Sequence, residues 1–138
     1  MADPTVRAAV ESALPSWLRD AQAVVDGHLR ASFPSLPRRM LSVERGLRYA
    51  KVVVDDGHGH RSVWAFVDTA TGDVLKPEGW AKPAAHARGN LLGGPVLDRA
   101  TGELVADRSL GRACLGPYGP NYLTDAQCAA LRRGRRAA

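Results

Sequence analysis

The 138-residue chain contains no hydrophobic run long enough to cross a membrane. A transmembrane helix needs about 20 consecutive apolar residues, and no stretch approaches that length. The first residues, Met-Ala-Asp-Pro-Thr, also lack the basic and then apolar pattern of a secretory signal. We therefore expect a cytoplasmic protein without a membrane partner.

Cysteine is scarce, since Cys114 and Cys128 are the only two in the chain. Without an export signal, free thiols in a reducing compartment are the expected state, and a bridge between the two is the alternative. Zinc sites use four ligands in paired spacings, and the chain contains neither Cys-x-x-Cys nor His-x-x-x-His. We read His58-Gly59-His60 as a solvated turn and expect no metal and no cofactor.

Catalytic signatures are absent as well. The chain has no phosphate-binding Gly-x-x-x-x-Gly-Lys, no nucleophile elbow and no Ser-x-x-Lys. Asp55 and Asp56 could form a carboxylate pair for Mg²⁺, but Asp-Asp-Gly is first of all a turn signal. His86 beside Arg88 could serve a phosphotransfer or nuclease site, yet no partner for this histidine is evident. A binding protein is therefore favoured over an enzyme.

The positive charge is unevenly distributed. Residues 1–75 carry nine basic and nine acidic side chains, whereas residues 76–138 carry ten and five, which accounts for the net charge of +5. Sixteen of the nineteen cations are arginine, whose planar guanidinium binds phosphate and stacks on bases. This favours an anionic partner, and codon bias in a GC-rich genome is the alternative.

The composition, with 45% hydrophobic and 24% charged residues, predicts a single globular domain over residues 1–138. We expect an α+β fold in which an N-terminal helical pair packs on an antiparallel β-meander of about four to six strands, closed by a short C-terminal helix.

The helical part is expected within residues 1–33. Asp3 can cap the first helix and Pro4 suits its first position, whereas Pro15 should end or kink it. A second amphipathic helix is predicted over residues 16–31, with an apolar stripe of Trp17, Leu18, Ala21, Val24, Val25 and Leu29.

Residues 39–107 are predicted to be rich in β-strands. Strands are expected over 40–45, 47–54, 63–67 and 73–75, with turns at 55–60 and 68–72. In the second turn the Asp68 side chain can bind the turn backbone and Gly72 can adopt a positive φ. The same pattern, two apolar residues, Asp, x-Ala-Thr-Gly and an acid, recurs at residues 96–105 and predicts another hairpin.

The last predicted element is a C-terminal helix over residues 124–134, where Thr124 and Gln127 form a capping box. Its end carries four arginines, which either form a solvated helix terminus or clamp nucleic acid: Arg132, Arg133, Arg135 and Arg136.

The basic loop over residues 76–90 is the main candidate site. Pro83 can start a short helix and Gly89 can end it, which would offer backbone N–H groups and cations to a phosphate. Purely structural roles for the tryptophan and the histidine are the alternative. The candidate ligand-binding residues are Lys76, Trp80, Lys82, His86, Arg88 and Asn90.

The core W-x-x-P-A-x-H-A-R-G-N of residues 80–90, which follows a β-hairpin, resembles a family of small, mostly uncharacterised proteins encoded by tailed bacteriophages and related mobile DNA. The segment G-P-Y-G-x-x-Y-L at residues 116–123 is similar to the closing motif of that family. The resemblance covers residues 49–92 and 116–123. Ala81 and Ala85 depart from it, since relatives often carry lysine there. The resemblance implies a phage context, and hence the host cytoplasm, but no reaction.

We therefore expect a protein that binds a phosphate-bearing partner, with nucleic acid first and a free signalling nucleotide second. Lys82 and Arg88 would neutralise charge, Trp80 would stack, and His86 and Asn90 would donate directional hydrogen bonds. A virion or assembly protein, in which the shared segment forms contacts within a homo-oligomer, is the alternative from another class.

Overall fold

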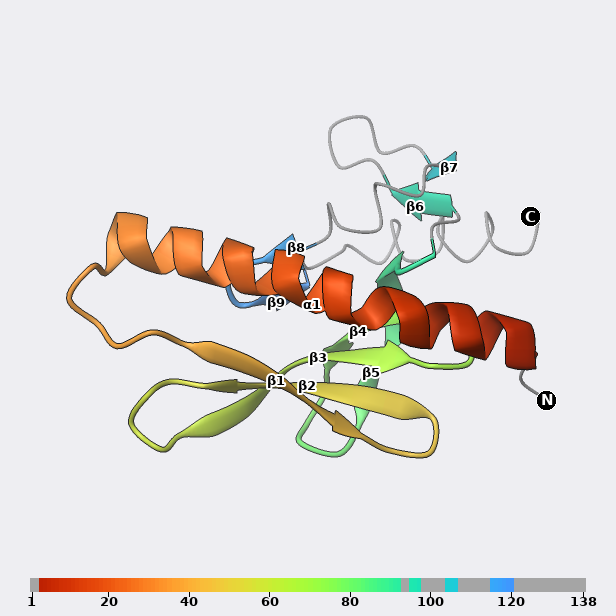
Figure 1. The fold of residues 1–138 in the computed structure, drawn as a ribbon, viewed down its shortest axis with the longest axis horizontal. Helices are drawn as coiled ribbons and strands as arrows, with labels where there is room; N and C mark the ends of the chain where they lie inside the picture. The colour runs from red at the N-terminus through yellow and green to blue at the C-terminus, as the bar shows by residue number, and fades with distance from the viewer. Residues whose placement is uncertain (1–2, 93–94, 98–103, 107–114, 121–138) are drawn as a thin grey trace.

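The computed structural model describes residues 3–92, 95–97, 104–106 and 115–120. One helix, α1 (Pro4–Ser32), lies across one face of a five-stranded antiparallel sheet (Figure 1). The strand order β1-β2-β3-β4-β5 makes the sheet a meander, with β1 (Met40–Arg45), β2 (Tyr49–Asp55), β3 (Arg61–Asp68), β4 (Asp73–Pro77) and β5 (Pro83–Asn90). Two small hairpins follow, one of β6 (Pro95–Leu97) and β7 (Leu104–Ala106), the other of β8 (Leu115–Gly116) and β9 (Gly119–Pro120).

The predicted N-terminal helical pair is wrong, because α1 continues through Pro15 as one helix of 29 residues. Its buried positions repeat every three or four residues on both sides of the proline: Val10, Leu14, Trp17, Ala21, Val25 and Leu29. Pro15 itself is exposed. The helix position that lacks a backbone N–H donor therefore lies on the solvent side. Burial of the apolar stripe on both sides of Pro15 keeps the two halves of α1 in line. The cap is as expected, since the Asp3 carboxylate accepts a hydrogen bond from Thr5 N (2.8 Å).

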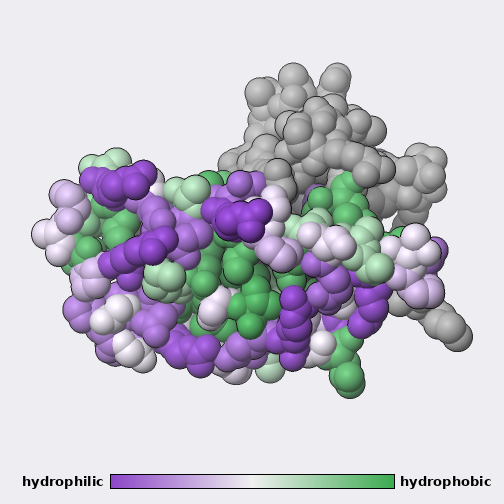
Figure 2. Space-filling view, viewed as in Figure 1, coloured by the Kyte–Doolittle hydropathy of each residue, from purple (hydrophilic) through white to green (hydrophobic). Residues whose placement is uncertain are grey.

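The core lies between α1 and the sheet. In Figure 2 hydrophobic residues gather between the helix and the sheet, with hydrophilic residues around them. A bulge in β3 at Trp64, where Val52 pairs with Ala65 and Val53 with Val63, leaves Trp64 outside the register. The Trp64 ring packs edge-on against Trp17 of α1, with 6.2 Å between ring centroids. The bulge thus gives the helix a large aromatic partner at the centre of the core.

The turn prediction at residues 68–72 is confirmed. The Asp68 carboxylate accepts a hydrogen bond from Ala70 N (2.9 Å), and Gly72 has a φ of 85°. At the related segment, β6 and β7 pair on either side of residues 98–103, so the flanking strands of the second hairpin are also present. The tip itself lies outside the described residues.

The basic loop 76–90 is mostly strand, which corrects the prediction of a short helix from Pro83 to Gly89. In β5, Ala87 pairs with Leu75 and Gly89 pairs with Val74 of β4. The helix-forming alanines of this segment are overridden because the edge of β4 offers backbone partners along β5. The predicted C-terminal helix over residues 124–134, with its four arginines, lies outside the described residues.

The β8–β9 hairpin packs against the meander. Lys76 Nζ of β4 donates a hydrogen bond to the Pro120 carbonyl (2.6 Å). Gly119 has a φ of 123°, and a Cβ there would lie 2.5 Å from the Trp64 carbonyl oxygen of β3. Only glycine fits this close approach of two backbones.

Candidate functional site

The candidate site lies on the sheet face opposite α1, which we call the outer face. Ala50 and Val52 of β2 belong to the core beneath α1, so Tyr49 and Lys51 point to the outer face by strand alternation. The connection from β4 to β5 brings Trp80 to Lys51 on this side. Two chain segments that are distant in sequence therefore meet here.

Two cations lie near the Trp80 ring. The Lys51 ammonium is 4.3 Å from the centroid of the indole ring, and the Arg61 guanidinium carbon is 6.0 Å from it. Both lie within the range of about 6 Å over which a cation is attracted to an aromatic face. The tryptophan is nevertheless 47% exposed, so part of the ring remains available to a ligand.

A second aromatic ring continues the surface along β2. The Arg48 guanidinium carbon lies 5.3 Å from the centroid of the Tyr49 ring, which packs edge-on against Phe66 (6.0 Å). A shallow hollow of about 280 Å³ is lined by Tyr49, Lys51, Phe66 and Ala81 among others. Another, of about 340 Å³, is lined by Arg61 and Trp80. The outer face thus offers two adjoining depressions with aromatic and cationic walls.

Most charges on this face are paired, and one cation is in excess. The ion pairs are Arg61–Glu44 (2.8 Å), Arg48–Asp68 (3.0 Å) and Lys82–Glu78 (3.3 Å). Among the residues that the structure describes, Lys51 is in no ion pair, and its ammonium lies over the Trp80 ring. Hydrogen bonding to Asp68 raises the pKa of Arg48 above its usual value. The paired acids hold the arginines in place without cancelling the charge of Lys51.

The six predicted site residues do not form one cluster. Trp80 and Lys82 belong to the β4–β5 connection at the outer face. Lys76 is half-buried beside β9, and its burial, with Arg88 nearby as a second cause, lowers the pKa of its ammonium. His86 is part of β5, and its side chain is outside the described part of the structure.

Asn90 has a structural role. It is 6% exposed, and its Nδ2 donates to the Thr71 carbonyl and to Asp73 Oδ1, both at 2.9 Å. Its Oδ1 accepts a hydrogen bond from Leu92 N (2.8 Å). The amide therefore ties the β3–β4 turn to the end of β5, and its hydrogen-bonding groups are directed into the protein.

The sequence model of a family of unknown function, DUF7717, matches residues 21–107, more than half of the chain. The chain belongs to the DUF7717 family. No curated protein and no solved structure matches it.

The region matched to DUF7717 includes the whole five-stranded sheet and every outer-face residue named above. It begins within α1 and ends before the β8–β9 hairpin. The outer face is therefore built entirely from the family region, whereas the partner of Lys76 at Pro120 comes from outside it.

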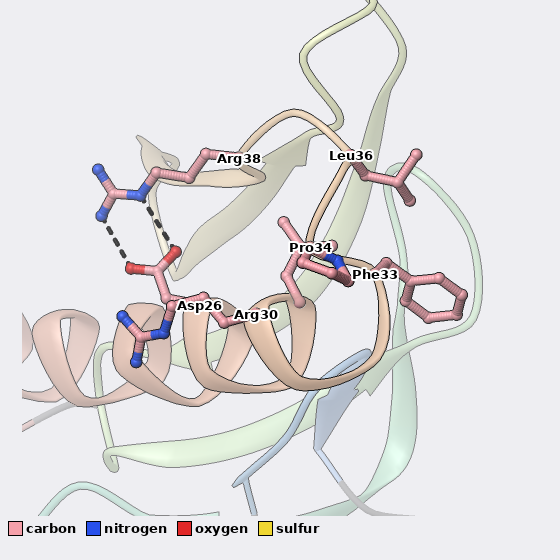
Figure 3. Close-up of a pocket in the computed structure, with 7 residues that line it drawn as sticks. Asp26, Arg30, Phe33, Pro34, Leu36 and Arg38 are labelled. Carbon is pink, nitrogen blue, oxygen red and sulfur yellow. Dashed lines mark hydrogen bonds and ion pairs between the residues drawn. The ribbon is translucent and has the colours of Figure 1, made fainter.

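The DUF7717 protein has a third hollow at the end of α1, with a volume of about 430 Å³ (Figure 3). Asp26 and Arg38 form a two-bond ion pair at one end (2.9 and 3.1 Å), and Phe33 and Leu36 lie at the other. Hydrogen bonding from Arg38 lowers the pKa of the Asp26 carboxyl. The hollow combines apolar walls with guanidinium groups and was not predicted from the sequence.

Within the described residues, no group of three or more histidine, cysteine, aspartate or glutamate side chains could hold a metal ion. In the turn before β3, the Asp56 carboxylate accepts hydrogen bonds from His58 N (2.8 Å) and His60 N (3.2 Å). These bonds lower the pKa of Asp56 and use this carboxylate to shape the turn. In the described part of the chain, no helix is both long and apolar enough to cross a membrane.

Proposed function

We propose that this DUF7717 protein binds nucleic acid on the outer face of its sheet. The observation that carries the proposal is the half-exposed Trp80 ring in contact with Lys51 and Arg61. Aromatic rings on which bases stack, set among cations that follow the backbone, are the parts used to bind single-stranded nucleic acid without sequence preference. The two adjoining hollows give such a strand an open path.

The cations of this face suit a phosphate partner. Lys51 can turn from the indole ring toward a phosphate, since an exposed cation–π contact contributes only about 0.5 to 1 kcal/mol. Arg48 and Arg61 are each held by one carboxylate and keep much of their side chains exposed, at 63% and 45%. Guanidinium groups positioned in this way can donate further hydrogen bonds to phosphate oxygens.

Other predicted residues would add to the interface. Lys82 is exposed beside Trp80, and the terminal arginines of residues 132–136 would contribute contacts to phosphate. The resemblance to phage proteins supports a role in replication or packaging inside an infected cell. In both settings sequence-independent binding of nucleic acid would be useful.

A direct test measures fluorescence anisotropy with a labelled oligothymidine of about 16 nucleotides, from low to moderate salt. Trp80→Ala should weaken binding at every salt concentration by about 1 to 3 kcal/mol, the value of one lost stack, while Trp80→Phe should retain most of the affinity. Lys51→Ala should lower the log–log salt slope by about 0.7, the contribution of one phosphate contact to a single strand.

Arg19→Ala is the matched control, because it removes one exposed cation from α1, on the other side of the sheet. It should leave both the affinity and the slope nearly unchanged. Absence of binding to any oligonucleotide at low salt would end the proposal. The proposal would also fail if Lys51→Ala and Arg19→Ala changed the salt slope equally and Trp80→Ala left the affinity unchanged.

The hollow at the end of α1 favours a second candidate, a free nucleotide. Phe33 could stack on a base, while Arg30 and Arg38 could bind phosphate. Native mass spectrometry of freshly purified protein would report a retained nucleotide and the oligomeric state together. Loss of that nucleotide in Phe33→Ala would support this site, whereas a symmetric oligomer without nucleotide would favour an assembly protein.

A further inference from the structure

The tip of the β1–β2 hairpin carries a leucine that is almost fully exposed. Leu47 has 96% of its surface exposed, more than any other large hydrophobic residue in the described part of the chain. Figure 2 shows a hydrophobic projection among hydrophilic residues near the end of this hairpin. Turn positions favour glycine, asparagine or aspartate, so neither turn formation nor core packing accounts for a leucine here.

The backbone around the leucine is held by hydrogen bonds on both sides. Arg7 of α1 donates a hydrogen bond to the Leu47 carbonyl (3.1 Å), and Gly46 N donates to the Tyr49 carbonyl (2.9 Å). On the other side, Thr69 N donates to the Arg48 carbonyl (2.9 Å). The backbone of such a supported turn loses little conformational freedom when the leucine meets a partner.

The surroundings of the leucine are cationic. Three guanidinium groups, those of Arg7, Arg45 and Arg48, lie on or contact the hairpin tip, against two carboxylates. The carboxylates are Glu11, paired with Arg45, and Asp68, paired with Arg48. This arrangement of one apolar side chain within a set of arginines is complementary to an apolar surface bordered by phosphates.

The tip is continuous with the outer face. Leu47 lines the same hollow as Tyr49 and Lys51, and Lys51 contacts Trp80. From Leu47 at the tip to Lys51 in β2, four residue steps span at most about 13 Å at the rise of an extended strand. A ligand bound at Trp80 that follows this hollow therefore reaches the leucine.

We propose that the nucleic acid bound by this protein is a junction between a duplex and a single strand. The Leu47 side chain packs on the last base pair, and the single strand runs past Tyr49 and Lys51 to Trp80. This inference rests on the proposed function and specifies its ligand. Leucine is among the residues that other proteins press against base faces, and a duplex end exposes such a face without the cost of unstacking. Arg7 and Arg48 contact phosphates beside that last pair.

The test compares three labelled probes by anisotropy at one salt concentration: an oligothymidine, a blunt duplex, and the same duplex with an oligothymidine overhang. The wild-type protein should bind the overhang duplex most tightly. Leu47→Ser should lower that affinity about ten-fold, which corresponds to the loss of burying one leucine side chain against the base pair. It should leave oligothymidine binding unchanged. Met40→Ser, which alters an exposed hydrophobic residue at the end of β1 away from the hairpin tip, is the control and should behave as wild type.

A fluorescent 2-aminopurine at the last base pair gives an independent readout, since its emission should change on binding of wild type and not on binding of Leu47→Ser. Equal binding of Leu47→Ser and wild type to all three probes overturns the junction and leaves the Trp80 interface standing. The junction is also overturned if Leu47→Ser loses the same affinity for oligothymidine as for the overhang duplex. Failure of the proposed function is a different result, in which Trp80→Ala changes nothing or no probe binds.

Discussion

Replacing Pro15 with alanine should stabilise the protein. Pro15 lies inside α1 on an exposed position, so alanine there restores one backbone donor and removes no buried surface. Proline is about 3 kcal/mol less favourable than alanine in a helix interior. The rigid ring also restricts the unfolded chain, which favours proline by about 0.4 to 1 kcal/mol. The net expectation is a gain of about 2 kcal/mol, or about 8 °C in Tm for a chain of this size.

Urea unfolding followed by circular dichroism measures this difference, with the slope of the transition as a check that the exposed surface is unchanged. Ala13→Gly is a useful control in the same turn, since it should lower stability by about 1 kcal/mol. A Pro15→Ala variant that is less stable than wild type would refute the reasoning. It would mean that a bend at this proline is needed to lay both halves of α1 on the sheet.

Three further changes probe the core, the close backbone contact and the ion pair. Trp17→Ala should cost about 3 to 5 kcal/mol by denaturant unfolding, because the ring is 1% exposed and packs on Trp64; an unchanged midpoint would contradict its place in the core. Gly119→Ala should lower the thermal midpoint by the equivalent of about 1 to 3 kcal/mol, since its φ of 123° and the Trp64 carbonyl both exclude a side chain. Asp26→Asn should cost at most about 1 kcal/mol at neutral pH, because Arg38 lowers the pKa of this carboxyl. The contribution of the Asp26–Arg38 ion pair to stability is complete above about pH 4 and is lost as the pH falls through the lowered pKa. The stabilities of wild type and Asp26→Asn should therefore converge in acid, and a difference that grows there would count against the ion pair.

The meander could be predicted because its signals are local. Strand alternation and turn residues such as Asp68 and Gly72 act over a few positions, and the structure confirms them. The predicted break in the helix at Pro15 was wrong. A single helix-breaking residue was given more weight than the apolar stripe, which keeps its helical spacing on both sides of the proline. The strand at Pro83–Asn90 was missed because its partner, the edge of β4, is a tertiary feature that alanine-rich sequence does not reveal.

The candidate site was predicted only in part. Trp80 was recognised from its residue type and its basic neighbours. Lys51 and Arg61 were not recognised, because they come from strands more than 18 residues away in sequence. The alternation in β2 was a usable signal, since it places Tyr49 and Lys51 together on one face. Asn90 was expected at the ligand, and the structure gives its amide three partners within the protein.

The docking of the β8–β9 hairpin has a consequence for the order in which the chain folds. Each strand of the meander pairs with its neighbour in sequence, so the sheet closes only short loops. The bonds from Lys76 to Pro120 and from His28 to Tyr118 instead join residues 44 and 90 positions apart. Closing such loops costs more chain entropy and slows the contacts that depend on them. During synthesis the sheet can therefore form before Pro120 has been made, and the hydrogen bond from Lys76 to Pro120 forms only after the β8–β9 hairpin has been synthesised.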